Sequence, residues 1–392
     1  MRKPFAFLSM IFLLTACWSN QEIDDEALVH GVGMDKAGDQ YRFNVEIVKP
    51  GSQFGQSRTV EQKGGENIIL DIESDSLLNG ARELIRKAKR RLYFGHTRVW
   101  IVGEELAKEN SLRLLDQIRR DQMNRINSYV FISEDDPRDI LSTPTLYEEL
   151  SAVEMVSALE QTKFISEYTP MTIYELFRRA EGPIKNVYIP MIKVAEEHGQ
   201  MITELDGTAV IKNEKMVGRL TKDESIGLTW LLNQVKGGSI TVKLDNDEER
   251  VALEISKTKT KIKPHLQGKD LDVGIDVRIE GTFADNITPF EPTRDFLKQI
   301  EEKIAKKIKK DIRDTLNKLQ HDLKTDITEI GIKTYRNYPK AFRKIENEWD
   351  DVFADADISI RVQINIYHQG LIDKSIKQTD KKPTNLPFPF FK

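Results

Sequence analysis

The sequence contains a single cysteine, Cys17, among its 392 residues. One thiol cannot form an intramolecular disulfide, and it cannot supply the several thiolates of a cysteine-based zinc site. The six histidines are far apart along the chain and lack metal-ligand spacing; they are His30, His96, His198, His265, His321 and His368. We therefore expect ordinary histidines and no metal or other cofactor.

The sequence also lacks a strong net charge and the common hydrolase motifs. Its 59 basic and 63 acidic residues give a formal charge of −4, which is too balanced to steer the molecule toward nucleic acid. Neither Gly-x-Ser-x-Gly nor His-Glu-x-x-His occurs in the chain, so a hydrolase would have no recognisable nucleophile or zinc site. We predict a protein that is not an enzyme and has no nucleic-acid partner.

Two ligand-binding motifs begin in this sequence and stay incomplete. Gly31-Val32-Gly33 resembles the start of a phosphate-binding loop, but Lys36 stands at the third glycine position and a hairpin pattern follows, which favours a strand. The acidic run 245–249 resembles the start of a calcium loop, but Arg250 stands where that loop needs glycine. A charged hairpin turn explains this run better.

Long apolar runs are absent after the first 16 residues, and a membrane-spanning helix needs about 20 apolar residues. The N-terminus itself has the parts of a signal peptide: basic Arg2 and Lys3, the apolar run Phe5–Leu14, and small residues before Cys17. Leu14-Thr15-Ala16-Cys17 also matches the bacterial lipobox, in which the cysteine sulfur receives diacylglycerol. We predict that residues 1–16 are removed and that Cys17 anchors the chain on the outer face of the cytoplasmic membrane.

Hydrophobic periodicity predicts a mixed α/β first domain over residues 17–198. Alternating apolar residues around a turn at 36–40 indicate a hairpin within 27–47, and residues 68–90 have helical spacing. Buried-strand patterns follow at 99–102, 129–132 and 187–192. Helical patterns lie near 104–121, 146–163 and 172–180, and Asp136-Pro137 opens a further short helix.

A small middle domain is predicted over residues 199–266. A strand at 207–211 precedes Thr221, which has Glu224 three residues later in the pattern of a capping box. A helix through Trp230 should follow, and apolar residues on both sides of 245–250 indicate a second hairpin.

The predicted C-terminal domain, residues 267–370, contains the clearest helical periodicity. Its apolar stripe consists of Phe296, Ile300, Ile304, Ile308, Ile312, Leu316, Leu319, Leu323 and Ile327. Residues 357–367 alternate like a strand, and we expect the long amphipathic helix to pack on it. The predicted fold class is therefore α+β, with three mixed α/β domains.

Two charged or apolar surfaces allow alternative interpretations. Lysines between 298 and 310 could contact anionic lipid, but interleaved Glu301, Glu302, Asp311 and Asp314 favour a solvated face with i,i+4 ion pairs. The tail 371–392 is predicted to be disordered. Its phenylalanines Phe388, Phe390 and Phe391 offer the alternative of dipping into the membrane interface.

Several stretches resemble the Ger(x)C family, the C-subunit lipoproteins of spore nutrient germinant receptors. The mature start Cys17-Trp18 and the Gly31-x-Gly33-x-Asp35 motif are the most specific of them. Further stretches that resemble the family are Arg91-Leu92 with His96, Ile101–Ala107, Pro137–Leu141, Lys215–Leu220, Glu224-Ser225, Trp230-Leu231, and Asp326-Ile327 with Gly331 and Trp349.

The resemblance implies a three-domain α+β lipoprotein that acts beside integral membrane A-type and B-type receptor subunits in nutrient-triggered germination. The sequence departs from the family pattern at Arg119–Arg125 and at Thr328-Glu329. The alternatives are a solute-binding lipoprotein of a membrane transporter, which should have two similar lobes around a cleft, and a cell-wall enzyme.

Overall fold

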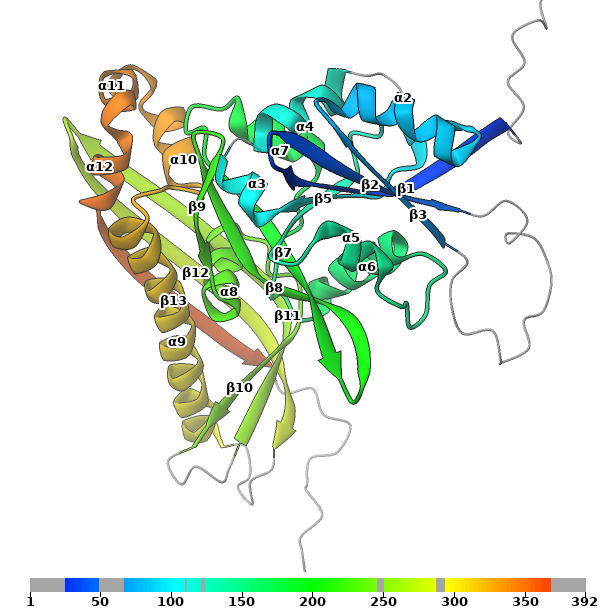
Figure 1. Ribbon diagram of the computed structural model, residues 1–392. Coiled ribbons are helices and arrows are strands. Elements are labelled where there is room, and N and C mark those ends of the chain that lie inside the picture. Colours follow the sequence, from blue (N-terminus) through cyan, green and yellow to red (C-terminus); the bar gives the residue numbers. More distant parts are fainter. Residues whose placement is uncertain are drawn as a thin grey trace, which may run out of the picture.

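Two β-sheets with flanking helices make up the computed structural model, which describes residues 25–48, 67–109, 111–120, 124–244, 250–286 and 293–367. Figure 1 shows the two sheets and the long helix α9. The predicted α+β class is confirmed. The signal peptide, Cys17, the acidic run 245–249, His368 and the tail 371–392 lie outside the described residues.

The first sheet has nine strands among the described residues, in the order β3-β2-β1-β5-β6-β7-β8-β9, with β4 paired to β1. The bounds are β1 Glu26–Ala37, β2 Gln40–Val48, β3 Asn67–Ser74, β4 Arg91–Tyr93, β5 Val99–Gly103, β6 Tyr129–Ser133, β7 Val187–Glu197, β8 Gln200–Lys212 and β9 Lys215–Leu220. The central pairs β1/β5, β5/β6 and β6/β7 are parallel, and both ends of the sheet are antiparallel.

The prediction of one helix over residues 68–90 is wrong in its first part. Residues 67–74 form β3, which pairs antiparallel with β2, and only α2, Leu77–Ala88, is helical. Ser76 caps this helix by accepting the N–H of Asn79. Residues 67–74 pair with the edge of the sheet because this pairing satisfies their backbone N–H and C=O groups. The apolar residues of the segment also fit a helical spacing, which is why the sequence pattern predicted a helix.

Helices cover both faces of the parallel centre of the first sheet, so that β5 is buried on both sides. Val99 and Ile101 pack with α5 (Pro137–Ser142) and α6 (Ser151–Gln161). Trp100 and Val102 face the larger core. That core also takes side chains from α2, α3, α4 and α7; the last three span Glu104–Glu109, Ser111–Arg120 and Ile173–Ala180.

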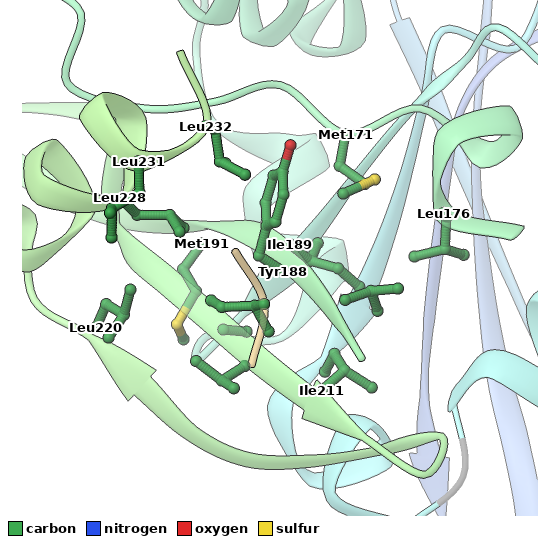
Figure 2. Close-up of a cluster of buried hydrophobic side chains, with 14 of the residues drawn as sticks. Met171, Leu176, Tyr188, Ile189, Met191, Ile211, Leu220, Leu228, Leu231 and Leu232 are labelled. Atoms are coloured by element: carbon green, nitrogen blue, oxygen red, sulfur yellow. The ribbon is translucent and has the colours of Figure 1, made fainter. Parts of the chain in front are cut away.

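The last strands of the first sheet carry α8, Lys222–Leu231, which begins with the predicted capping box of Thr221 and Glu224. Figure 2 shows Leu228 and Leu231 of α8 in one buried cluster with Tyr188, Ile189 and Met191 of β7. This cluster is continuous with the core of the second sheet, so the two sheets share buried apolar surface.

In the part of the chain that the structure describes, the second sheet has four strands in the order β10-β11-β12-β13, with bounds Ser239–Lys243, Arg250–Gln267, Asp270–Asn286 and Asp357–Tyr367. Helix α9, Arg294–Asn317, lies along this sheet (Figure 1). Ile300, Ile304, Ile308 and Ile312 are buried, so the packing of the long helix on a sheet is confirmed. A π-helical turn, Lys318–Asp322, ends it; Leu323 and Ile327 lie beyond the helix.

Three short helices, α10 Ile330–Asn337, α11 Pro339–Ile345 and α12 Trp349–Ala354, connect α9 to β13. On the exposed side of α9, Lys307 pairs with Asp311 at 3.0 Å and Lys310 with Asp314 at 2.5 Å, as the i,i+4 interpretation predicts. None of the helices in the described ranges is both long and apolar enough to cross a membrane.

The predicted domain boundaries fall inside two hairpins. The boundary at 198/199 lies in the turn between β7 and β8, and the boundary at 266/267 falls before Gln267, the last residue of β11; β7 and β8, and β11 and β12, are each joined by backbone hydrogen bonds. The division into three domains therefore stays a prediction, and the two sheets are the units used below.

Candidate functional site at the junction of the two sheets

A fully buried carboxylate, Asp326, organises the loop between α9 and α10. Its Oδ1 accepts the backbone N–H of Thr328 at 2.9 Å and the hydroxyl of Thr328 at 2.6 Å. Its Oδ2 accepts the N–H of Gly331 at 2.8 Å and the indole N–H of Trp349 at 3.3 Å. Burial raises the pKa of Asp326, and these four hydrogen bonds oppose that rise.

Gly331 is required here because the chain passes close to its neighbours. A Cβ at this position would lie 2.3 Å from the Cδ1 of Ile184 and 2.7 Å from the Oδ2 of Asp326. The three residues that resemble the family in this region, Asp326, Gly331 and Trp349, therefore form one contact cluster. Sequence spacing alone does not bring Trp349 to Asp326, because the contact depends on how α10, α11 and α12 fold back.

Arg179 of α7 connects the first sheet to this loop. Its Nη2 donates to the Oε1 of Glu329 at 2.9 Å, and its guanidinium lies 4.9 Å from the ring centroid of Tyr188. The side chain of Arg179 is only 8% exposed, and its Nε has no hydrogen-bond partner among the described residues. Burial raises the pKa of Tyr188 to about 12, so that ring stays neutral beside the guanidinium.

A cavity of about 170 Å³ lies at this junction, between the end of α7 with residues 182–186 and the segment 326–336. Arg178, Arg179 and Arg336 line it, together with Asn186, Asp326 and Thr328. Arg178 pairs with Glu175 at 2.6 Å. The sequence prediction named none of these residues as a site, because they come from two distant parts of the chain.

A second, more open cavity of about 440 Å³ lies beside α4 and α7. Arg119 lies 4.6 Å from the ring centroid of Phe177 and donates to Asp116 at 2.6 Å and to Glu181. Asp116 also pairs with Arg120 at 2.6 Å. The charges of this cavity largely neutralise one another, so it offers no clear ligand chemistry.

The Gly31-x-Gly33-x-Asp35 motif has a packing role. A Cβ on Gly31 would lie 2.6 Å from the Cδ2 of Leu141, and one on Gly33 would lie 2.7 Å from the Cβ of Pro137. The glycines thus let α5 approach β1, and the interpretation of this segment as a strand is confirmed. Asp35 occupies the space above Gly103, where a Cβ would lie 2.3 Å from its Oδ1.

Glu46 of β2 is a second buried carboxylate. Its oxygens accept the N–H groups of Ser151 at 2.8 Å and Ala152 at 3.0 Å, at the start of α6, and the amide of Asn67 at 2.9 Å. Burial raises the pKa of Glu46. The carboxylate satisfies backbone donors that a helix leaves open at its N-terminus.

Two histidines that are distant in the sequence, His30 and His96, lie together in the structure. The ring centroids of His30 and His96 are 5.9 Å apart, because β4 pairs with β1 just before the turn that carries His96. His30 is 7% exposed, and neither ring nitrogen has a partner among the described residues. Burial, with the charges of His96 and Arg98, lowers its pKa to about 4. The described residues contain no group of three or more potential metal ligands.

Comparison with known proteins identifies the family from both halves of the chain. Residues 19–194 match the model of the spore germination protein N-terminal domain, and residues 206–370 match the model of the spore germination B3/GerAC-like C-terminal domain. The chain belongs to the Ger(x)C family. Membership in this family supports a role in spore germination.

Curated relatives from Bacillus subtilis (strain 168) align along nearly their whole length. Spore germination protein YndF is 25% identical, with 93% of this chain and 95% of the relative covered. Spore germination protein B3 is 24% identical, with 95% and 100% covered. The crystal structure of the GerBC protein has a TM-score of 0.54 and 24% identity, and covers 86% of this chain and 96% of its own; it supports the shared fold.

Proposed function

We propose that this Ger(x)C protein is a non-enzymatic, lipid-anchored subunit of a spore nutrient germinant receptor. It would act beside two integral membrane subunits of the A and B types. Diacylglycerol on Cys17 would hold it on the outer face of the inner spore membrane. The observation that carries the proposal is the match of both family models, which together cover residues 19–194 and 206–370.

The position of the match supports the lipid anchor. The N-terminal family model begins at residue 19, two residues after Cys17 of the lipobox. Strand β1 begins at Glu26, nine residues after Cys17. An extended chain spans at most about 3.6 Å per residue, and the first sheet would therefore stay within a few nanometres of the bilayer.

The test uses sporulating cells that lack this gene or carry Cys17→Ala. Germination would be followed against a panel of amino acids and sugars after deletion of the other germinant receptors. We expect both strains to lose the response to one nutrient class, because an unanchored subunit leaves the membrane surface. Metabolic labelling with a radioactive fatty acid should mark the wild-type protein and not Cys17→Ala.

A matched control is Ser19→Ala, two residues further along. It should keep both the label and the germination response, since the serine lies after the attachment point. Normal germination of the deletion strain on every nutrient would contradict the receptor role. Normal germination of Cys17→Ala alone would contradict the need for the anchor.

The transporter alternative is less well supported by the fold. A solute-binding lipoprotein should have two similar lobes around a cleft. Within the described residues, this chain has a nine-stranded mixed sheet and a four-stranded sheet that carries a long helix, and the two are unlike each other.

A further inference from the structure

The cavity at the junction of the two sheets contains a buried cation with unused hydrogen-bonding capacity. Arg179, whose whole residue is 9% exposed, lines the cavity. Its Nη2 binds Glu329, but its Nε–H has no partner within the described part of the chain. An unsatisfied buried donor costs about 1–3 kcal/mol. A ligand that accepts this hydrogen bond would therefore satisfy the buried donor and remove this cost.

The charges around the cavity favour an anion. Of the described residues, three arginines and one carboxylate line it. Arg178 and Arg179 are each paired with a glutamate, Glu175 and Glu329, so Arg336 supplies the positive charge that is left over. Arg336 makes no ion pair with any described residue. The carboxylate, Asp326, directs its oxygens to four hydrogen-bond donors of the 326–331 loop and Trp349, so its own charge is largely compensated. Guanidinium groups match the planar geometry of a carboxylate particularly well.

The size of the cavity limits the ligand. Pockets for drug-sized molecules have volumes of roughly 300–1,000 Å³, and this cavity has about 170 Å³. A compact carboxylate of a few non-hydrogen atoms fits that volume. The side chains of a protein partner would have to enter between α7 and α10 to reach Arg179, and its low exposure disfavours this route.

We propose that this cavity binds a small free carboxylate between Arg179 and Arg336, and that the bound anion links the first sheet to the α10 segment. Asn186, which is 6% exposed and lines the same cavity, supplies a neutral polar group. The site stands on the geometry of the junction and is independent of the proposed receptor role.

The test is calorimetric titration of the full-length purified protein with sodium acetate, at constant ionic strength and pH 7. Acetamide is the neutral probe of matched shape. We expect acetate to bind with a Kd on the order of millimolar, as fits an anion with so few atoms, and acetamide to bind at least tenfold more weakly. Sodium chloride over the same range should give no saturable heat, which separates carboxylate binding from general ionic effects.

Variants test the assignment of the two arginines. Arg336→Gln removes a cation that is exposed on α10, so the fold should tolerate it, and acetate binding should weaken about tenfold or more. Arg179→Lys keeps the charge for Glu329 but loses the Nε–H, and it should weaken binding similarly. Arg343→Gln, an exposed arginine of α11 outside the cavity, is the control and should bind like the wild type.

Equal affinity for acetate and acetamide would overturn the proposal, because the site would not select an anion. Unchanged acetate binding in Arg336→Gln would overturn the place of the site. Absence of any saturable acetate signal in the wild type would also overturn it, and water would then be the expected partner of the Arg179 Nε. None of these outcomes would bear on the germination phenotype of the deletion strain.

Discussion

Several individual residues determine how the elements of this fold contact one another. Some are glycines at close approaches of the chain, and others are buried charged side chains. Asp326, Gly331 and Trp349 look unrelated in the sequence, yet in the structure two of them donate hydrogen bonds to the third. The sequence can mark such residues through a family resemblance. It cannot reveal their contact, because periodicity reports which face of an element is buried and says nothing about its partner.

His30 should make the stability of the protein depend on pH. Its pKa is lowered to about 4 in the folded state from an ordinary value of 6.5. Between these values the unfolded chain binds more protons than the folded one, so stability falls as the pH drops through this window. We expect the urea midpoint of the wild type to fall more between pH 7 and pH 5 than that of His30→Gln, which cannot titrate.

His198→Gln provides the control for this pH prediction. His198 is exposed at the turn between β7 and β8, so its replacement should leave the pH dependence of the wild type intact. Parallel pH dependence in the wild type and His30→Gln would show that the buried imidazole does not titrate in this window.

At the scale of elements, strong local signals gave correct predictions and ambiguous ones did not. The capping box of α8 appears where the sequence predicted it, and so does the stripe of α9 as far as Leu319; the last two predicted positions, Leu323 and Ile327, lie beyond the helix. Residues 68–74 were misassigned because Ile69 and Ile72 fit a helical spacing as well as a strand. The outcome there depends on the free edge of β2, which lies outside the local pattern.

The crossing of α8 and α9 depends on Gly227. A Cβ at this position would lie 2.1 Å from the Oγ1 of Thr315 and 2.4 Å from the backbone oxygen of Asp311. Alanine is more favourable than glycine within a helix by about 1 kcal/mol, but the steric overlap of the new Cβ should cost about 1–3 kcal/mol or more. We expect Gly227→Ala to lower the free energy of unfolding, measured by urea denaturation.

The prediction for Gly227→Ala is tested by the sign of the change in the free energy of unfolding. A gain of stability in Gly227→Ala would mean that the two helices separate without cost. The double variant Gly227→Ala/Thr315→Ala removes one of the two close atoms, so it should be less destabilised than the sum of the two single variants.

At the scale of the whole molecule, the sequence predicted the α+β class but did not reveal that the two sheets share a core. Both predicted boundaries, 198/199 and 266/267, lie at hairpins within the sheets. Contacts that cross between the sheets, such as Arg179 with Glu329 and Lys212 with Asp350, join residues more than a hundred positions apart. No local pattern in the sequence predicts these contacts.

A shared core predicts that the two sheets unfold together. Trp100 lies buried in the first sheet, with its indole N–H on the hydroxyl of Ser128 at 2.8 Å, whereas Trp349 belongs to α12 beside the second sheet. Two variants would be unfolded in urea, one that keeps only Trp100 and one that keeps only Trp349 of the four tryptophans in the sequence. Within each variant, we expect the fluorescence midpoint to coincide with that of far-ultraviolet circular dichroism, which reports both sheets.

A midpoint that differs between the two signals would mean that the sheets unfold separately. The junction around Arg179 would then be a contact between two independently stable units, rather than part of one cooperative core.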